Sequence, residues 1–382
     1  MNHAGFLFYT EWRLRLGFFC FAFLLFLSLT PAAAQFPPVK TGPLQPPVGQ
    51  ASEGCAVNGP SSCEEAAAKI VPLVMGPSPL EENLRGFAAG VDGGLNGPSR
   101  MAQAVKWALG AFRAAGVEVH TEEYTIPDKA PDGAGAPGER ENVVGEIRGW
   151  EKPDEVVILG ARLSPGESSV NALDSGCDAA LVIEAARAIK ASGLLPRRSI
   201  RFVLFSEDTQ GTLGSWAYVK HHEAELNNVR AMIAFDKGVG RVTGYSLGGR
   251  RDIEAGLREA VKPLDSLGAT QDTYDAFYGA DNFDFLLQGV PTLVPNQSEA
   301  PPVANSHPAS DAPHKVDIGE LKRQTAIAAV TAWGIADRPE PLGKRLSRAD
   351  TETLLQETGL EEQMKRLGLW SSWENGARGR KP

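Results

Sequence analysis

Residues 200–215 read IRFVLFSEDTQGTLGS, and this stretch decides the fold class. Its first six residues are apolar apart from Arg201, a pattern typical of a strand buried in a sheet. Polar residues follow, with Gly211 and Gly214 as turn formers, and a helical pattern then covers residues 213–222. A buried strand that passes through a polar turn into a helix is typical of α/β proteins.

The same alternation continues on both sides of this stretch. Further strands are expected at residues 117–124, 142–148, 156–163, 232–235, 242–247 and 291–294. Further helices are expected at residues 64–73, 99–115, 178–191, 253–261 and 318–335, and an exposed loop at residues 128–141. Alternating strands and helices predict a largely parallel sheet with helices on both faces. Ligand sites of such sheets lie at the carboxyl ends of the strands.

The N-terminus has the pattern of a secretory signal peptide. Arg13 and Arg15 precede an apolar run at residues 16–29, and small residues then lead to a predicted cleavage site after Ala34. A retained membrane anchor is the alternative. We therefore expect an exported protein, periplasmic or extracellular, whose signal peptide engages the export machinery.

The rest of the chain divides into three expected parts. Residues 35–54 are rich in proline and glycine and are expected to form a linker. One α/β domain is expected at residues 55–340, followed by a helical C-terminal tail at residues 341–382. The tail carries apolar residues that would pack on the domain or, as the alternative, dock on a partner; these are Leu367, Leu369, Trp370 and Trp373.

Charge and cysteine content narrow the partners and the compartment. The net charge of −9 and the absence of a lysine and arginine cluster argue against nucleic acid as a partner, because phosphate contacts require such a cluster. Cys55 and Cys63 flank a turn-like segment and would form a disulfide in an oxidising compartment. Cys177 is then expected to be unpaired and buried.

Polar residues stand where the predicted strands end, at the edge where a ligand site is expected. Arg162 and Ser164 belong to the end of the strand at 156–163, and Asp174 lies in the segment that leads into the next helix. The strands at 200–205 and 232–235 are followed by further polar positions, and a histidine lies nearer the C-terminus; these residues are Asp208, Thr209, Asp236 and His307.

This layout resembles the zinc-dependent aminopeptidase family that includes bacterial leucyl aminopeptidases, glutamate carboxypeptidase II and glutaminyl cyclase. The resemblance covers residues 64–337 and implies a three-layer α/β/α sandwich with a mixed, mostly parallel sheet. In that family a first His, a bridging Asp, a Glu, a later Asp and a late His hold two zinc ions, and another Glu is the general base. The resemblance places Asp174, Asp236 and His307 on three ligand positions and Asp208 on the general base.

The same resemblance shows where this chain departs from the family. Arg162 stands at the first histidine and Thr209 at the metal-binding glutamate, so neither zinc keeps the three protein ligands that a catalytic zinc normally has. Zinc is therefore expected to be absent or weakly bound. The guanidinium of Arg162 would instead neutralise Asp174, Asp236 or both, as a built-in substitute for the second metal. Glu207 and His314 remain alternative ligands, and Asn282 stands where family members often carry a histidine.

Three functions follow from these observations. The leading hypothesis is an exported aminopeptidase-like pseudoenzyme with an incomplete two-metal site that still binds peptides. The alternative is an active metallo-aminopeptidase with one weak or unusual metal site, which would hydrolyse N-terminal peptide bonds with Asp208 as base. The third is an envelope protein whose C-terminal tail docks on a partner. The sequence indicates no substrate and no oligomeric state.

Overall fold

The computed structural model describes residues 63–92, 98–126, 138–165, 169–206, 212–298 and 316–382. The expected signal peptide, the linker and Cys55 lie outside the described residues, and so do Asp208, Thr209 and His307. Within the described part, no helix is both long enough and apolar enough to cross a membrane.

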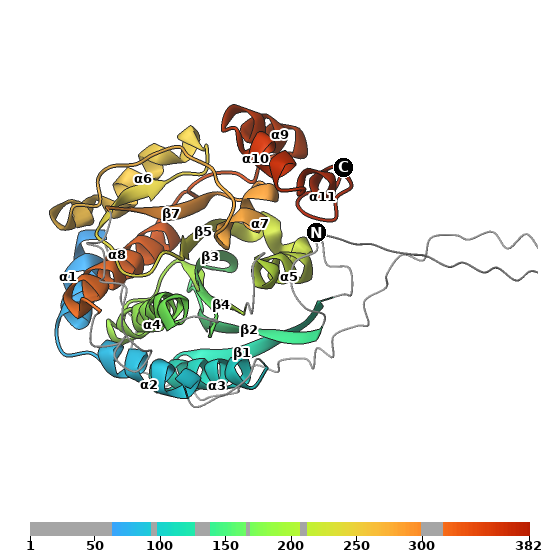
Figure 1. The fold of residues 1–382 in the computed structure, drawn as a ribbon. Coiled ribbons are helices and arrows are strands. Elements are labelled where there is room, and N and C mark those ends of the chain that lie inside the picture. The colour runs from blue at the N-terminus through green and yellow to red at the C-terminus, as the bar shows by residue number, and fades with distance from the viewer. Residues whose placement is uncertain (1–62, 93–97, 127–137, 166–168, 207–211, 299–315) are drawn as a thin grey trace, which may run out of the picture. The chain divides into compact units, whose positions relative to one another are not determined.

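A seven-stranded mixed sheet forms the centre of the domain, with the strands in the order β1-β2-β4-β3-β5-β7-β6 (Figure 1). The four central strands β4, β3, β5 and β7 run parallel to one another, and β1, β2 and β6 are antiparallel to their neighbours. The strand bounds are β1 Glu118–Ile126, β2 Gly138–Ile147, β3 Lys152–Leu163, β4 Arg198–Ser206, β5 Val229–Phe235, β6 Val242–Ser246 and β7 Thr292–Gln297.

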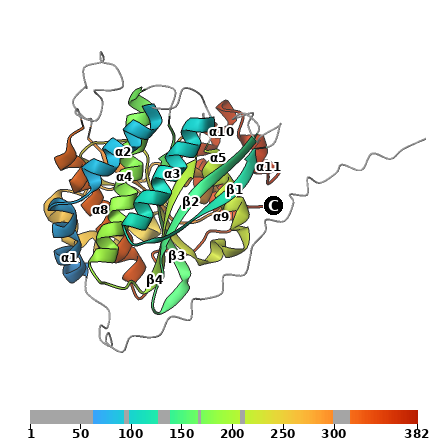
Figure 2. The ribbon, with the colours of Figure 1, turned by 90° about the horizontal axis from the view of Figure 1, so that it is seen from below.

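Helices cover both faces of this sheet. One face carries α1 to α4, α6 and α8, which are Cys63–Met75, Leu80–Asp92, Pro98–Ala114, Ser169–Ala191, Glu254–Val261 and Ile318–Asp337 (Figures 1 and 2). The other face carries α5 Leu213–His221 and α7 Asn282–Leu287 (Figure 1). The fold is therefore an α/β/α sandwich with a mixed sheet, as predicted.

Apolar side chains on the two faces explain the layering. Val157, Leu159 and Ala161 of β3 pack against the α4 and α8 side, and Ile158 packs into the cluster on the α5 side. Adjacent residues of a strand point to opposite faces, so a strand that is apolar throughout must be buried between two layers of helices. The buried pattern of residues 156–163 thus positions the end of β3, where Arg162 lies, in the middle of the sheet.

The structure corrects one expectation about local structure and adds two helices that the sequence analysis did not predict. Strand β2 begins at Gly138, within the stretch expected to be a loop, because residues 138–146 pair with β1. Helix α2 contains Gly86 and Gly90, which weaken helix propensity, and it was missed. Helix α7 has only six residues, too few for a periodic pattern, and was also missed.

Three further helices follow α8: α9 Arg348–Glu357, α10 Leu360–Arg366 and α11 Trp370–Glu374. They share an apolar cluster with α7, in which Leu369 and Trp373 are buried beside Phe283 and Leu287. Leu367 is half exposed and lies outside that cluster. Packing on the chain's own domain, which we favoured over docking on a partner, is therefore correct for Leu369 and Trp373.

Candidate ligand site

Arg162 and Asp236 lie together at the carboxyl ends of neighbouring parallel strands. Ala161 of β3 is paired with Phe235 of β5. Arg162 and Asp236 follow these two residues in the sequence, so they lie side by side at this edge of the sheet. Arg162 Nη2 donates a hydrogen bond to Asp236 Oδ2 at 3.0 Å and a second one to the carbonyl of Gly279 at 3.1 Å. Asp236 is almost fully buried, whereas about a third of the Arg162 side chain is exposed. The sequence analysis expected Arg162 to pair with Asp174, Asp236 or both, and the structure shows the pairing with Asp236.

Lys237 follows Asp236 in the sequence, and its side chain points elsewhere. Its ammonium group lies over the ring of Phe277, with Nζ 5.0 Å from the ring centroid. Burial raises the pKa of Asp236 to about 6, and the charge and hydrogen bond of Arg162 act against that rise. Arg162 is thus the cation in direct contact with Asp236.

Two more carboxyl groups adjoin the pair, both from the first turns of α4. Asp178 is buried, and its Oδ2 accepts a hydrogen bond of 2.9 Å from the amide of Gly238. Its Oδ1 has no hydrogen-bond partner among the described residues. Burial, and then the charge of Asp236, raise the pKa of Asp178 well above its ordinary value. Our sequence reasoning missed Asp178, although its i, i+4 spacing from Asp174 places both on one helix face.

Asp174 lies beside the turn that follows β5. Gly238 has φ +65°, and a Cβ built on it would lie 2.7 Å from Asp174 Oδ1. The absence of a side chain at residue 238 therefore lets the backbone reach this carboxylate. Asp174 is exposed, and burial of part of the group raises its pKa. Among the described residues, it accepts no hydrogen bond.

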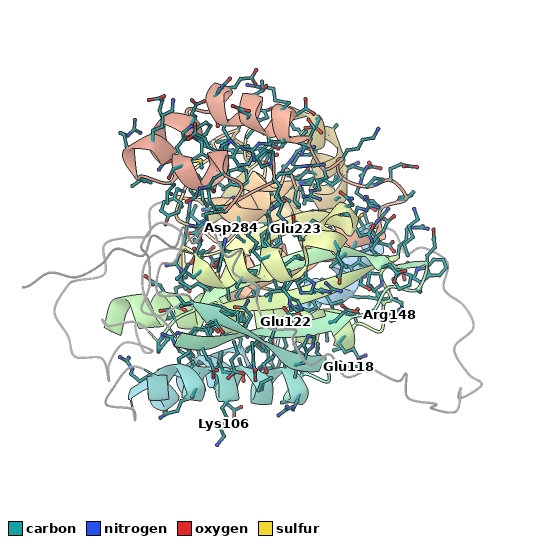
Figure 3. All side chains as sticks on the ribbon, turned by 90° about the vertical axis from the view of Figure 1, so that its right-hand side faces the viewer. Lys106, Glu118, Glu122, Arg148, Glu223 and Asp284 are labelled. Atoms are coloured by element: carbon teal, nitrogen blue, oxygen red, sulfur yellow. The ribbon has the colours of Figure 1, made fainter. Side chains whose placement is uncertain are left out.

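A second buried ion pair lies beside the start of α5. Arg378, from the chain beyond α11, donates hydrogen bonds from Nε to Asp284 Oδ1 at 2.8 Å and from Nη2 to Asp284 Oδ2 at 3.0 Å. Both side chains are almost completely buried. Figure 3 shows Asp284 beside α5 on the tail side of the molecule. Sequence reasoning missed this pair, because Arg378 lies in a short basic segment near the C-terminus.

The residue that both partners contact is Thr212, which precedes α5. Thr212 has φ 49° and ψ 36°, a left-handed conformation that is costly for a β-branched residue. Its hydroxyl donates to Asp284 Oδ2 at 3.0 Å and contacts Arg378 Nη2, and its carbonyl accepts from Ser215 Oγ at 3.0 Å. These contacts hold Thr212 in its unusual conformation.

The described residues alone do not supply the ligands of a pair of zinc ions, and the expected site residues Asp208, Thr209 and His307 lie outside the described part. Among residues that the structure describes, no group of three or more His, Cys, Asp or Glu side chains could hold a metal ion. Asp236, which the resemblance places on a zinc-ligand position, is paired with the guanidinium of Arg162. The guanidinium of Arg162 lies 3.0 Å from Asp236 and would repel a zinc ion bound to that carboxylate, since two positive charges in a partly buried site repel strongly. Ser164 donates its amide to Ser175 Oγ at 2.8 Å, which ties the end of β3 to α4.

Comparison with known proteins identifies the family. The model of peptidase family M28 matches residues 142–332, which is half of the chain. This chain belongs to peptidase family M28. The match contains Arg162, Asp174, Asp178 and Asp236, so the whole described site lies inside the family region.

Among curated proteins, carboxypeptidase Q of Rattus norvegicus is 29% identical over 201 residues, which are 53% of this chain and 42% of that protein. The matched part of this chain thus spans less than half of that relative. A peptidase M28 precursor from Shewanella amazonensis has a TM-score of 0.65 at 18% identity, covering 75% of this chain and 99% of its own. A zinc aminopeptidase from Bacillus subtilis has a TM-score of 0.51 at 13% identity, covering 75% of this chain and 98% of its own. These likenesses support the fold and zinc as a cofactor of the family.

Proposed function

We propose that this protein is an exported member of peptidase family M28 that binds peptides without hydrolysing them. In this proposal Arg162 replaces the charge of a metal ion, and the protein is a pseudoenzyme. The single observation that carries the proposal is the ion pair of Arg162 with the buried Asp236, at 3.0 Å.

The ligand class follows from the charges around this pair. Asp178 and Asp174 lie near this pair, since the charges of Asp236, Asp174 and Arg162 all act on Asp178, and Asp174 is the exposed carboxylate. An exposed carboxylate beside a buried acidic cluster attracts a cation, and the free α-ammonium group of a peptide is a cation that an aminopeptidase-like fold receives. The site therefore favours peptides with a free N-terminus over peptides whose N-terminus is acetylated.

A binding assay tests this proposal. A tripeptide, Leu-Gly-Gly, with a fluorophore on its C-terminal end and a free amine, is titrated with the full-length mature protein in the presence of a chelator. The expected result is binding that does not require metal, weaker binding of the N-acetylated peptide, and no cleavage. Asp174→Asn is expected to weaken binding about tenfold, as loss of one charge-assisted hydrogen bond would.

Asp154→Asn is the matched control, because Asp154 is an exposed aspartate at the opposite end of β3. This variant changes the net charge equally and should leave the affinity unchanged. Cleavage of the peptide that appears with added zinc and disappears with the chelator would overturn the pseudoenzyme proposal. It would instead support an active aminopeptidase with an unusual metal site.

Export is a separate part of the proposal. It rests on the basic, apolar and small-residue segments of residues 13–34. N-terminal sequencing of the protein recovered from outside the cytoplasm should begin at Gln35. An unprocessed N-terminus would favour a retained membrane anchor instead.

A further inference from the structure

The side chain of Arg378 carries the C-terminal tail to α7 and to the start of α5. Its guanidinium is fully buried, and it contacts Asp284 on α7 and Thr212 at the start of α5. These residues belong to three parts of the chain that are far apart in sequence. Arg378 lies beyond the family match, which ends at residue 332.

Thr212 and Asp284, two of the residues that Arg378 contacts, are close in sequence to candidate site positions. Thr212 directly follows residues 207–211, which contain the candidate positions Asp208 and Thr209. Asp284 lies five residues after Gly279, whose carbonyl accepts a hydrogen bond from Arg162. One buried guanidinium therefore holds both the start of α5 and the segment that supports Arg162.

The contacts are specific to an arginine. The planar guanidinium donates from two nitrogens to the two oxygens of Asp284, and the same Nη2 reaches the hydroxyl of Thr212. Ser215 Oγ also donates to Asp284 Oδ2, at 3.1 Å. A lysine would keep the charge but could not make this set of contacts, because it has a single nitrogen on a flexible stem.

We propose that Arg378 is a positioning residue of the ligand site, and that the C-terminal tail is thereby part of the binding machinery. It fixes Thr212 in the left-handed conformation and fixes α7 against the start of α5. Arg162, which donates a hydrogen bond to the carbonyl of Gly279 just before α7, is then held in place for a ligand. The predicted effect of Arg378 on peptide binding rests on the proposed function, whereas its predicted effect on the start of α5 does not.

Hydrogen exchange of the Trp216 amide tests the positioning directly, because this amide donates to the carbonyl of Thr212 at 3.0 Å. Arg378→Lys is compared with Arg348→Lys. Arg348 also anchors the tail, by donating to the carbonyls of Trp373 and Glu374, but the described contacts of its side chain do not include α5. The expected result is exchange of the Trp216 amide at least about tenfold faster in Arg378→Lys, with the rate unchanged in Arg348→Lys. Equal effects of the two variants, or none, would overturn the proposal.

Peptide affinity supplies the second readout. Arg378→Lys should bind the free-amine tripeptide about 5- to 20-fold more weakly than the natural protein, a typical coupling between distant residues and a site. Unchanged affinity with faster exchange would refute the link to the ligand site. If the natural protein binds no peptide, the proposed function fails, and hydrogen exchange alone decides the positioning role.

Thr212→Gly keeps the test decisive if Arg378→Lys does not fold. Glycine adopts the left-handed conformation without strain but lacks the hydroxyl that Arg378 and Asp284 contact. This variant should speed exchange at Trp216 while exchange in α9 and α10 stays unchanged. Unchanged exchange at Trp216 in Thr212→Gly would contradict the proposal.

Discussion

Arg162 and Asp236 occupy equivalent positions at the ends of two neighbouring parallel strands, and their side chains meet at 3.0 Å. The sheet register alone brings them together, since each directly follows a paired residue. A carboxylate at this position needs a cation because it is buried, and this chain supplies one covalently. Under the proposed function, this ion pair balances the charge of Asp236 without a metal ion.

Arg162→Ala should destabilise the protein by about 1.5–3 kcal/mol, the typical value of hydrogen bonds to charged groups. The cost is lower than for a fully buried ion pair, because about a third of the Arg162 side chain is exposed. Urea unfolding measures the change. Arg162→Lys keeps the charge and should lower the free energy of unfolding by less than Arg162→Ala does. Equal stability of the natural protein and Arg162→Ala would show that the ion pair contributes nothing to stability.

Gly238→Ala should destabilise the protein more than Gly193→Ala. Both glycines have positive φ, of +65° and +71°, so both substitutions carry a similar conformational cost of about 1–2 kcal/mol. A Cβ at Gly238 would also lie 2.7 Å from Asp174 Oδ1, whereas nothing lies within 4 Å of one at Gly193. The difference in unfolding free energy between the two variants therefore reports the close approach of this turn to Asp174. Equal costs would mean that Asp174 moves aside freely.

Glu122 should make stability depend on acid pH. Burial alone would raise its pKa, but hydrogen bonds with His120 and His222 outweigh this and lower it to about 2. Because the folded pKa lies below the unfolded one, the stabilisation is present above about pH 4.5 and is lost as the pH falls toward 2. Glu122→Gln should thus cost on the order of 2–3 kcal/mol at pH 7 and progressively less in acid.

Glu123→Gln is the control for that measurement, since Glu123 is the exposed neighbour of Glu122 on β1. Its effect on the free energy of unfolding should be small at every pH. A cost of Glu122→Gln that stays constant between pH 7 and pH 3 would refute the assignment of this stability to the carboxylate of Glu122.

Trp373→Ala should destabilise the protein by about 3–5 kcal/mol, as large-to-small substitutions of buried aromatic residues do. Trp373 is almost completely buried against α7, and Arg348 stacks on its ring with 4.2 Å between the Arg348 Cζ and the ring centroid. Leu367→Ala, at a half-exposed site of the same tail, should change stability by less than about 0.5 kcal/mol. Similar small effects of both variants in thermal unfolding would mean that the tail does not belong to the folded core.

The sequence predicted the part of the fold and of the site that depends on local pattern. The strands at 156–163 and 200–205 are apolar apart from Arg162 and Arg201, and such a pattern is typical of a buried parallel strand. The partner of Arg162 was predictable because residues that follow adjacent strands lie close together. By contrast, Gly86 and Gly90 hid α2, whose stability comes from packing rather than helix propensity.

The contribution of the tail could not be predicted, because it depends on contacts between residues far apart in the chain. Arg378 lies in a short basic segment, GARGRK at residues 376–381, whose composition is typical of a solvated terminus. Only the packing of α9, α10 and α11 on α7 carries it to Asp284, 94 residues away in sequence. Asp178, in contrast, could have been predicted, because it lies four residues after Asp174 and therefore on the same face of the helix.

Zinc content tests the central claim most directly. The full-length mature protein and the double variant Arg162→His with Thr209→Glu are loaded with zinc and dialysed against a mild chelator, and the bound metal is counted. The variant restores the two family ligands that the sequence lacks, so each metal position again has three protein ligands. We predict less than about one zinc per chain in the natural protein and tight binding in the double variant. Stoichiometric zinc that survives dialysis in the natural protein would contradict the replacement of metal by Arg162.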